Sequence, residues 1–489
     1  MIVLLLFLLP LLAGLISFFY RDDKTAHVWA LIISFITLGL SVAACVQTTN
    51  AHLFYTAPFL TGLGSSFTLQ LDGLSKILVL LTNVAYPIIL ISTWRGDYNK
   101  SHNFFALMLL TQAGLIGVFT SRDALLFYFF WELALIPVYF LCSGWGGERR
   151  IPITFKFFIY TFVGSILMLI GLVYLYFQTP DHSFALQSFY NLHLPISTQH
   201  WVFWLLFVAF AVKMPLFPLH TWQPDTYEES PTAVTMVLSA IMVKMGVYGV
   251  IRWVLPVVPT AAYSWGDFVS SLAVIGIIYA SILAFQQNDL KRLVAYSSIA
   301  HVGIMITAIF AGNHIGLQGV MMQMFNHGIN ILGLWIVIDL IERQFGTRKI
   351  SELGGLAVKA PSLALFLVVV ALANISLPLT NAFVGEFAMF TGIFTSTITK
   401  YNIVFTVLAA VSIILAAVYT LNMIRRVFFG PNELTANAHD LRFNEGLALG
   451  ALVVMIVVFG VYPQPILHIT DGYVQSLLGQ VNFTQYVVR

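Results

Sequence analysis

The sequence is poor in charge and in cysteine, and each shortage excludes a class of protein. Only 9% of its 489 residues are charged, whereas soluble domains carry about 25%. No stretch supplies the long polar linker that a soluble multidomain protein needs. Cys45 and Cys142 stand far apart in apolar segments, so the sequence has no CxxC pair, structural zinc pattern or iron–sulfur ligation by cysteine. The net charge of +2 gives no indication of a nucleic-acid partner.

Apolar residues dominate instead, at 59% of the chain. They gather in windows that can cross a hydrocarbon core of about 30 Å, which takes roughly 20 helical residues. The first window has no basic n-region and no cleavage site, so it predicts a spanning helix and not a removable signal peptide. We expect an all-α polytopic membrane protein, a single transmembrane domain over residues 1–489, with about fourteen transmembrane helices and a short strand within 47–72. The expected spans lie near 2–20, 26–46, 73–94, 103–121, 123–142, 152–178, 200–219, 231–255, 268–286, 291–311, 315–340, 362–398, 404–424 and 446–464.

Lysine and arginine divide unequally between the two sets of loops. Short cytoplasmic loops collect these residues, so the richer set is expected to face the cytoplasm and both termini to lie outside a bacterial inner membrane. Loops after odd-numbered spans hold Arg21, Lys24, Arg95, Lys100, Arg149, Arg150, Lys156, Lys291, Arg292, Arg343, Arg348, Lys349, Lys359, Arg425, Arg426 and Arg442. The other set holds Arg122, Arg252, Lys400 and Arg489.

The stretch AVKMPLFPLHTW predicts that the seventh span is broken beside a buried lysine. Pro215 and Pro218 have no N–H, so the carbonyls of Ala211 and Met214 are expected to lose their intrahelical partners next to Lys213. Neither an ammonium nor unpaired backbone is tolerated against lipid. We therefore expect this point to face a wet or protein-lined interior.

The twelfth span is expected to be broken as well. Its window, 362–398, is too long for one straight span, and Pro378 frees the carbonyl of Asn374. The two breaks lie five spans apart, as in two inverted five-helix repeats, spans four to eight and nine to thirteen. The sequence alone is weak evidence for this repeat. The ionisable residue of the first copy, Lys213, precedes its proline, whereas that of the second copy, Glu386, follows its proline.

Six ionisable side chains are expected near the middle of their spans, where a buried charge costs most. Two carboxylates balance two ammoniums, so the row can be buried with neutral histidines. Glutamate, lysine and histidine all exchange protons, and the row therefore predicts proton transfer. Structural ion pairing and a haem held by the two histidines are the alternative interpretations. The six residues are Glu132, Lys213, Lys244, His301, His327 and Glu386.

Pairing within this row predicts a switch. Desolvation lowers the pKa of a buried lysine and raises that of a buried glutamate by as much as about 3–5 units, and a nearby opposite charge reverses both effects. Lys213 is thus expected to hold its proton while Glu132 is close and to release it when Glu132 withdraws. One pKa unit is about 1.36 kcal/mol, and moving one charge against 100 mV takes about 2.3 kcal/mol.

Other polar residues are weaker candidates. Asp72, in LQLDGLS, is expected to cap the third span. Asp289 is expected to anchor the cytoplasmic start of the tenth span. His220 and Asp225 follow the seventh span in a loop, where solvated or capping roles compete with a functional one.

Six blocks carry a further signal, namely FTLQLDGLS, FYFFWELALIPVYFL, KMPLFPLHTWQPD with SPTA and KMGVYG, DLKRLVAYSSIAHVG, QMFNHGI and LPLTNAFVGEF. Together they resemble the antiporter-like subunits of respiratory complex I, most closely the M type, over essentially the full length. The resemblance implies a proton-translocating subunit that couples quinone reduction elsewhere in the complex to pumping, with no redox centre, cofactor or metal of its own. It also implies L-type and N-type antiporter-like partners and contact with membrane lipids.

The family's roles carry over to the midplane row. In such proteins the glutamate of span five pairs with the lysine of span seven, and a hydrated axis continues through the remaining lysine and histidines to a residue in span twelve. Residues 123–255 would form the first half-channel region and residues 268–424 the second. The carried-over residues are the same six, Glu132, Lys213, Lys244, His301, His327 and Glu386.

Three positions refine or depart from the family pattern. Glu386 favours the M type, because L-type and N-type subunits usually have lysine there. Tyr227 replaces the histidine of the usual DAHxEAP loop, and Leu379 replaces the usual glycine after the proline of span twelve. A subunit of a multi-chain sodium/proton antiporter or of a membrane-bound hydrogenase is the alternative function.

Overall fold

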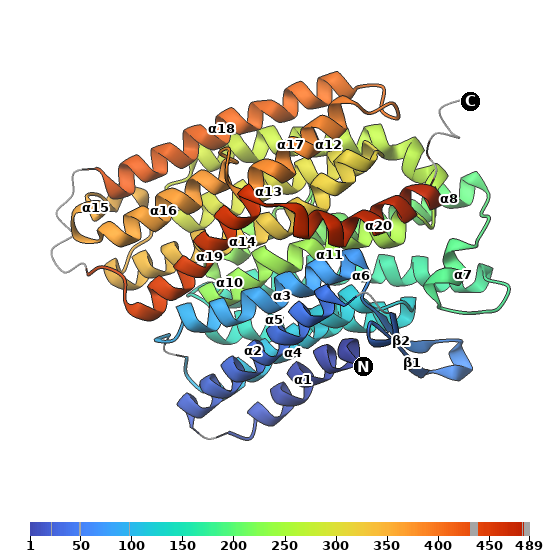
Figure 1. Ribbon diagram of the computed structural model, residues 1–489, viewed down its shortest axis with the longest axis horizontal. Coiled ribbons are helices and arrows are strands. Elements are labelled where there is room, and N and C mark those ends of the chain that lie inside the picture. The colour runs from blue at the N-terminus through green and yellow to red at the C-terminus, as the bar shows by residue number, and fades with distance from the viewer. Residues whose placement is uncertain (21, 48–49, 97, 431–438, 482, 484–489) are drawn as a thin grey trace.

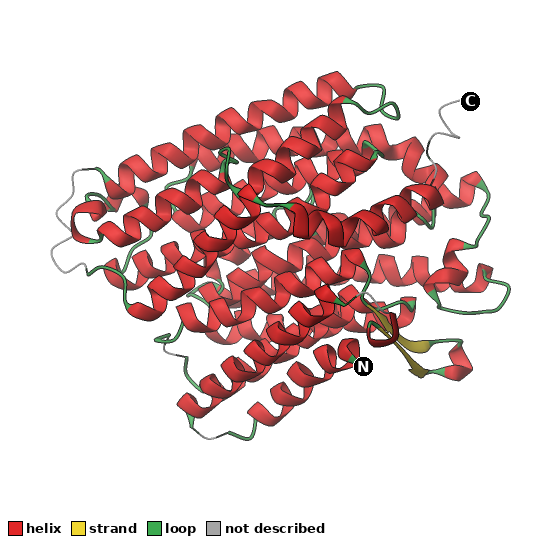
Figure 2. Ribbon diagram, in the orientation of Figure 1, coloured by secondary structure: helices red, strands yellow, loops and turns green. Residues whose placement is uncertain are grey.

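Helices make up most of the chain. The computed structural model describes residues 1–489 except 21, 48–49, 97, 431–438, 482 and 484–489. Arg21 and Arg489, two of the basic residues counted above, lie outside the described part. Most helices run side by side in one bundle, and the described strands form one small hairpin at one end of it (Figure 1; Figure 2). The expected all-α membrane fold is confirmed.

The elements follow one another along the chain. Up to residue 254 they are α1 (Ile2–Ser17), α2 (Asp23–Val46), η1 (Asn50–His52), β1 (Phe54–Pro58), η2 (Thr61–Leu63), β2 (Ser66–Gln70), α3 (Gly73–Ser92), α4 (Ser101–Thr120), α5 (Ala124–Trp145), α6 (Arg150–Gln178), α7 (Leu186–Tyr190), α8 (Ile196–Lys213), α9 (Trp222–Glu229), α10 (Thr232–Val237), η3 (Leu238–Met242), α11 (Val243–Gly249) and η4 (Val250–Val254). They continue as α12 (Pro259–Gln286), α13 (Leu290–Phe310), α14 (His314–Phe345), η5 (Ile350–Glu352), α15 (Leu356–Lys359), α16 (Pro361–Asn374), α17 (Asn381–Phe394), α18 (Asn402–Phe428), α19 (Phe443–Val461) and α20 (Gln464–Val481).

Twelve helices of the described chain are long and apolar enough to cross a membrane, and α1, α16 and α17 are shorter apolar helices. The segments η3 and η4 are π-helical and belong to one continuous span, Thr232–Val254. The ninth predicted span, 268–286, was too short, because α12 begins at Pro259, where a proline suits the first helical turn. The count of about fourteen and the inverted repeats stay predictions.

One end of the bundle carries the hairpin, and we call it the hairpin end. Strands β1 and β2 pair antiparallel, which confirms the strand expected within 47–72. The hairpin is joined to the neighbouring loop where the N–H of Arg122 donates to the carbonyl of Thr68 at 2.9 Å. The chain's N-terminus lies at the same end, because its amino group contacts the carbonyl of His52 at 3.4 Å (Figure 1).

The opposite end, which we call the basic end, is held by ion pairs. Asp225 of α9 accepts from Lys156 of α6 at 2.8 Å and from Arg292 of α13 at 2.9 Å. Glu228 lies 2.8 Å from Arg292 and 3.2 Å from Arg348. Burial alone would raise the pKa of Asp225, but hydrogen bonds from the lysine and arginine outweigh it and hold the pKa below its ordinary value. Asp225 therefore ties α9 to both α6 and α13 at this end.

The seventh span is broken at the position predicted from Pro215 and Pro218. Helix α8 ends at Lys213, and α9 begins only at Trp222. The expectation for Ala211 was wrong: its carbonyl accepts from the N–H of Leu216 at 2.9 Å, because the chain gains one residue in the turn that Pro215 imposes. The break thus lies beside Lys213 but leaves less unpaired backbone than expected.

The twelfth span is broken too, between Asn374 at the end of α16 and Asn381 at the start of α17. Leu379 lies in this break with φ +74°, in the left-handed region that favours glycine. This backbone angle explains why glycine is usual at that position. The 72% exposed leucine side chain avoids a steric clash in the interior.

A third break follows, which was not predicted from the sequence. Helix α19 ends at Val461, and α20 begins at Gln464 and packs against α3 and α14. A side chain at Gly460 would put its Cβ 2.2 Å from the carbonyl oxygen of Leu379. The last predicted span, 446–464, therefore ends in contact with the break of the twelfth span. Pro463 lies between α19 and the further helix, α20.

Candidate functional site

The six predicted midplane residues differ in exposure. Lys213, Lys244, His301, His327 and Glu386 are each at most 6% exposed, whereas Glu132 is half-buried. Phe129 and Ile136 lie one helical turn before and after Glu132 and are 53% and 48% exposed. Glu132 therefore faces the side of the bundle more than its centre.

Lys213 is buried without a hydrogen-bond partner for its ammonium among the described residues. Its Nζ atom lies 5.8 Å from the ring centre of Trp131 and 5.7 Å from that of Phe157, within cation–π range. Oε1 of Glu132 is also buried without a partner, and no described ion pair joins it to Lys213. The expected pairing of Glu132 with Lys213 stays a prediction, and this structure has the two groups apart.

Lys244 is fully buried in α11, between the π-helical segments η3 and η4. Its ammonium lies 2.9 Å from the carbonyl oxygen of Ser239, five residues earlier, and 2.8 Å from Nδ1 of His327. A π-helical turn frees backbone groups that an α-helix would pair, and such turns are frequent at functional sites. The sequence therefore supplies Lys244 with one backbone partner and one titratable partner.

Two histidines continue the row to α17. The ring centres of His327 and His301 are 5.3 Å apart, and Nδ1 of His301 lies 2.9 Å from Oε1 of Glu386. Lys244, His327, His301 and Glu386 thus form one buried chain in which each group lies next to another that can exchange a proton. The geometry supports proton transfer along this half of the row.

The same geometry does not fit a haem. The rings of His301 and His327 are tilted by 58° with their centres 5.3 Å apart. Non-bonded carbon atoms stay about 3.5–4.0 Å apart, so a macrocycle has no room between them.

A polar face of α14 surrounds His327 and was not among the sequence predictions. Gln323 Nε2 donates to Glu386 at 3.2 Å, Asn326 Nδ2 to the carbonyl of Asn381 at 2.7 Å, and Asn330 Nδ2 to that of Ala373 at 3.2 Å. The spacing of these side chains at 323, 326, 327 and 330 places them on one helix face. That spacing was visible in the sequence and could have identified them.

The weaker candidates have structural contacts. Asp72 accepts from the N–H of Ser75 at 3.0 Å, which confirms that it caps α3. Asp289 caps α13 in the same way, through the N–H of Arg292. His220 is buried and stacks on Phe217.

The glycine of KMGVYG lets two helices touch at the Lys213 break. A Cβ added to Gly246 would lie 2.5 Å from the carbonyl oxygen of Phe210 and 2.9 Å from the backbone nitrogen of Met214. Both atoms are backbone and cannot rotate away. Gly246 therefore brings α11 directly against the end of α8.

A Gly246→Ala variant is expected to lower the thermal stability of the purified protein and to impair transport. Overpacking costs about 1–3 kcal/mol, which exceeds the gain of about 1 kcal/mol in helix propensity. Gly39→Ala is the matched control, because nothing lies within 4 Å of the Cβ position in α2. Equal melting temperatures for both variants would contradict the close contact.

Comparison with known proteins assigns the family. A model described as NADH:quinone oxidoreductase/Mrp antiporter, TM, matches residues 121–412, more than half of the chain. The chain belongs to this NADH:quinone oxidoreductase/Mrp antiporter family. The matched segment includes all six midplane residues and both proline breaks of the seventh and twelfth spans, so the family assignment and the buried chain concern the same part of the molecule.

Likeness to individual members of the family extends over the whole chain. NADH-quinone oxidoreductase subunit M of Rickettsia prowazekii (strain Madrid E) is 35% identical over 485 residues, 96% of this chain and 97% of the relative. Subunit M of Pseudomonas aeruginosa is 35% identical over 502 residues, 97% of each. A chain of respiratory complex I from Thermus thermophilus with bound NADH has a TM-score of 0.89 at 27% identity and covers 98% of this chain and 100% of its own length.

Proposed function

We propose that this chain is a proton-translocating membrane subunit of an NADH-quinone oxidoreductase, respiratory complex I. The observation that carries the proposal is its full-length likeness to subunit M of that enzyme. Quinone reduction elsewhere in the assembly supplies the energy, and this chain contributes no redox centre. Its partners are the antiporter-like subunits of the L and N types, together with membrane lipids.

The proposed route follows the midplane row. A proton enters from the basic end near α8 and α11 and is held at Lys213 under the control of Glu132. It passes to Lys244, crosses His327 and His301, and leaves through Glu386. Residues 123–255 form the first half-channel region and 268–424 the second. The short contacts from Lys244 to His327 and from His301 to Glu386 support the second part of this route.

The proposed orientation places the basic end in the cytoplasm of a bacterium and both termini outside the inner membrane. Its support is the excess of lysine and arginine in loops at that end. Protons then move from the basic end towards the hairpin end. An alkaline phosphatase fused to the N-terminus should be active, since that enzyme folds only outside the cytoplasm, and a fusion in the loop after α5 should be inactive.

Purification through an affinity tag on this chain tests the function. The tagged chain is expected to co-purify with NADH:quinone oxidoreductase activity, and the assembly in proteoliposomes should pump protons when NADH and quinone are added. An uncoupler should abolish the pH gradient without stopping NADH oxidation. Co-purification with a complex that exchanges sodium for protons and oxidises no NADH would overturn the proposal in favour of the antiporter alternative.

A further inference from the structure

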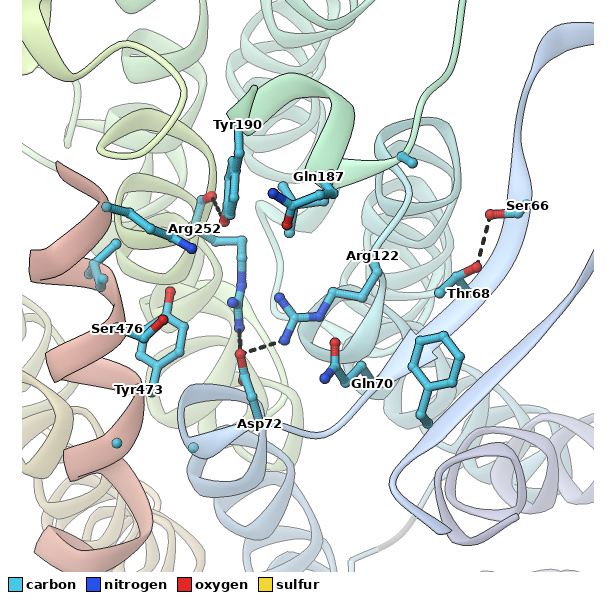
Figure 3. Close-up of a pocket in the computed structure, with 17 residues that line it drawn as sticks. Ser66, Thr68, Gln70, Asp72, Arg122, Gln187, Tyr190, Arg252, Tyr473 and Ser476 are labelled. Atoms are coloured by element: carbon cyan, nitrogen blue, oxygen red, sulfur yellow. Dashed lines mark hydrogen bonds and ion pairs between the residues drawn. The ribbon is translucent and has the colours of Figure 1, made fainter. Parts of the chain in front are cut away.

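Four lysine or arginine side chains are buried in the described part of the chain, and three of them have a polar partner at 2.8–2.9 Å. The three are Lys244, which contacts the carbonyl oxygen of Ser239 and His327, Lys291, which pairs with Glu342, and Arg252, which pairs with Asp72 (Figure 3). The fourth, Lys213, has none among the described residues, although it is only 2% exposed. Burying an ammonium without a hydrogen-bond partner costs free energy, so the charged form of Lys213 needs another source of stabilisation.

Two aromatic rings flank this ammonium. Nζ of Lys213 lies over the ring of Trp131, 5.8 Å from its centre, and over the ring of Phe157, 5.7 Å from its centre. Both aromatic residues are at most 1% exposed. The face of an aromatic ring attracts a cation within about 6 Å of its centre, and the attraction is strongest where water is excluded. The two rings therefore present the kind of surface that stabilises a buried positive charge.

Further aromatic side chains keep both rings in place. The ring of Phe157 lies 5.0 Å from that of Trp222, and the indole N–H of Trp222 donates to the carbonyl of Val212 at 2.9 Å. This bond joins the start of α9 to the residue before Lys213. Trp131 packs against two further rings, those of Phe127 and Phe210, at 5.6 and 5.7 Å. The rings around Lys213 are thus fixed to the break in the seventh span.

The ring of Trp131 and the carboxylate of Glu132 come from neighbouring positions of α5. Consecutive residues of an α-helix point about 100° apart, because the helix has 3.6 residues per turn. Trp131 is buried, whereas Glu132 is half-buried and its Oε1 has no partner among the described residues. In this structure the ammonium of Lys213 therefore faces the ring, and the carboxylate lies one residue further along the same helix.

Other titratable groups on the elements around the break have partners of their own. They are Lys156 with Asp225, Tyr160 with Thr221, His220 with the rings of Phe217 and Tyr279, and Lys244 with Ser239 and His327. Glu132 is the group whose charge acts on Lys213. The pH response of this lysine therefore depends on its burial, on the two rings and on one carboxylate.

We propose that Trp131 and Phe157 form an aromatic cage that holds the Lys213 ammonium while it is separated from Glu132. A ring attracts a cation less strongly than a buried carboxylate does, so the cage keeps the proton on the lysine and still lets it pass on. Without the rings, the separated ammonium would lie in an apolar site, which disfavours its charged form. The two aromatic residues are thus positioning residues of the switch. The inference rests on the proposed function, since it assumes that Lys213 carries protons.

Fluorination of Phe157 tests the cage, because fluorine withdraws electron density from the ring face and hardly changes the size of the ring. Phenylalanine with one, two or three ring fluorines replaces Phe157 through an amber suppressor, and the whole complex is placed in proteoliposomes. The ratio of protons pumped to electrons from NADH is measured from neutral to alkaline pH. Since the cage favours charged Lys213, the midpoint of the alkaline loss of pumping should move to lower pH with each fluorine, by about one pH unit for three.

Phe207 supplies the matched control. It lies in α8 with Lys213, is 2% exposed and packs against two other phenylalanine rings. Three fluorines at this position should leave the midpoint unchanged. An unchanged midpoint with three fluorines on Phe157, or the same shift from both positions, would overturn the cage.

Substitution of the second ring gives an independent check. Trp131→Phe keeps an aromatic face and should shift the midpoint less than Trp131→Leu, which removes the face. Equal shifts in these two variants would count against the cage, because a loss of packing alone does not depend on an aromatic face. Wild-type complex that pumps no protons with NADH would instead refute the proposed function.

Discussion

A Lys213→Ala variant is expected to assemble normally but to lose NADH-driven proton pumping. Alanine cannot hold a proton at the break between α8 and α9, where the proposed route crosses to the second half of the row. Assembly should survive, because the ammonium has no hydrogen-bond partner among the described residues, so alanine breaks no short contact there. Quenching of a pH-sensitive dye in inverted membrane vesicles, read beside the rate of NADH oxidation, measures the ratio of protons to electrons.

The matched control for this variant is Lys291→Ala. Lys291 is also buried, at 4% exposed, but its ammonium pairs with Glu342 at the basic end at 2.8 Å. Arg348 still neutralises Glu342 in that variant, so pumping should continue. Glu132→Ala should match Lys213→Ala if the two groups form the switch. A normal proton-to-electron ratio in Lys213→Ala would refute the role of this lysine.

Breaks and caps could be predicted from the sequence because their causes are local. Pro215 and Pro378 each remove an N–H within four residues of the carbonyl concerned, so the letters themselves show where the span breaks. Asp72 lies three residues before the N–H it accepts from, which makes capping equally visible. The prediction of a free carbonyl at Ala211 was wrong because the backbone could adjust. The N–H of Leu216 donates to that carbonyl in place of the missing N–H of Pro215.

Long-range partners could not be predicted in this way. Arg252 contacts Asp72 across 180 residues, and no spacing rule relates the two. In the sequence, Arg122 and Arg252 count only towards loop charge, and nothing indicates that both contact the carboxylate of Asp72. Similarly, the sequence predicts how deep Lys213 and Glu132 lie in the membrane, from their positions along their spans. It does not predict which face of each helix points towards the centre of the bundle. Glu132 accordingly lies half-buried at the side of the bundle.

The last link of the row allows a second decisive substitution, Glu386→Gln. Glutamine keeps the size of the side chain and can still accept a hydrogen bond from Gln323, but its amide does not exchange protons as a carboxyl does. The fold should therefore hold while pumping is lost. Weakening the contacts with His301 and Gln323 should cost about 1–3 kcal/mol in stability, the range for a buried polar group that loses its hydrogen-bond partner. The dye assay used for Lys213→Ala measures the loss.

Two comparisons make the Glu386 result specific. Glu445→Gln changes another buried glutamate, which accepts from the N–H of Arg442 in the capping box of α19 at the basic end. Glutamine can keep that bond, so pumping should continue. The double variant Lys213→Ala with Glu386→Gln should pump no worse than either single variant, because groups that act in series on one proton are not additive. A fully active Glu386→Gln would return this glutamate to a structural role. Partial activity in each single variant that falls further in the double variant would mean two parallel paths, and the single buried row would then be wrong.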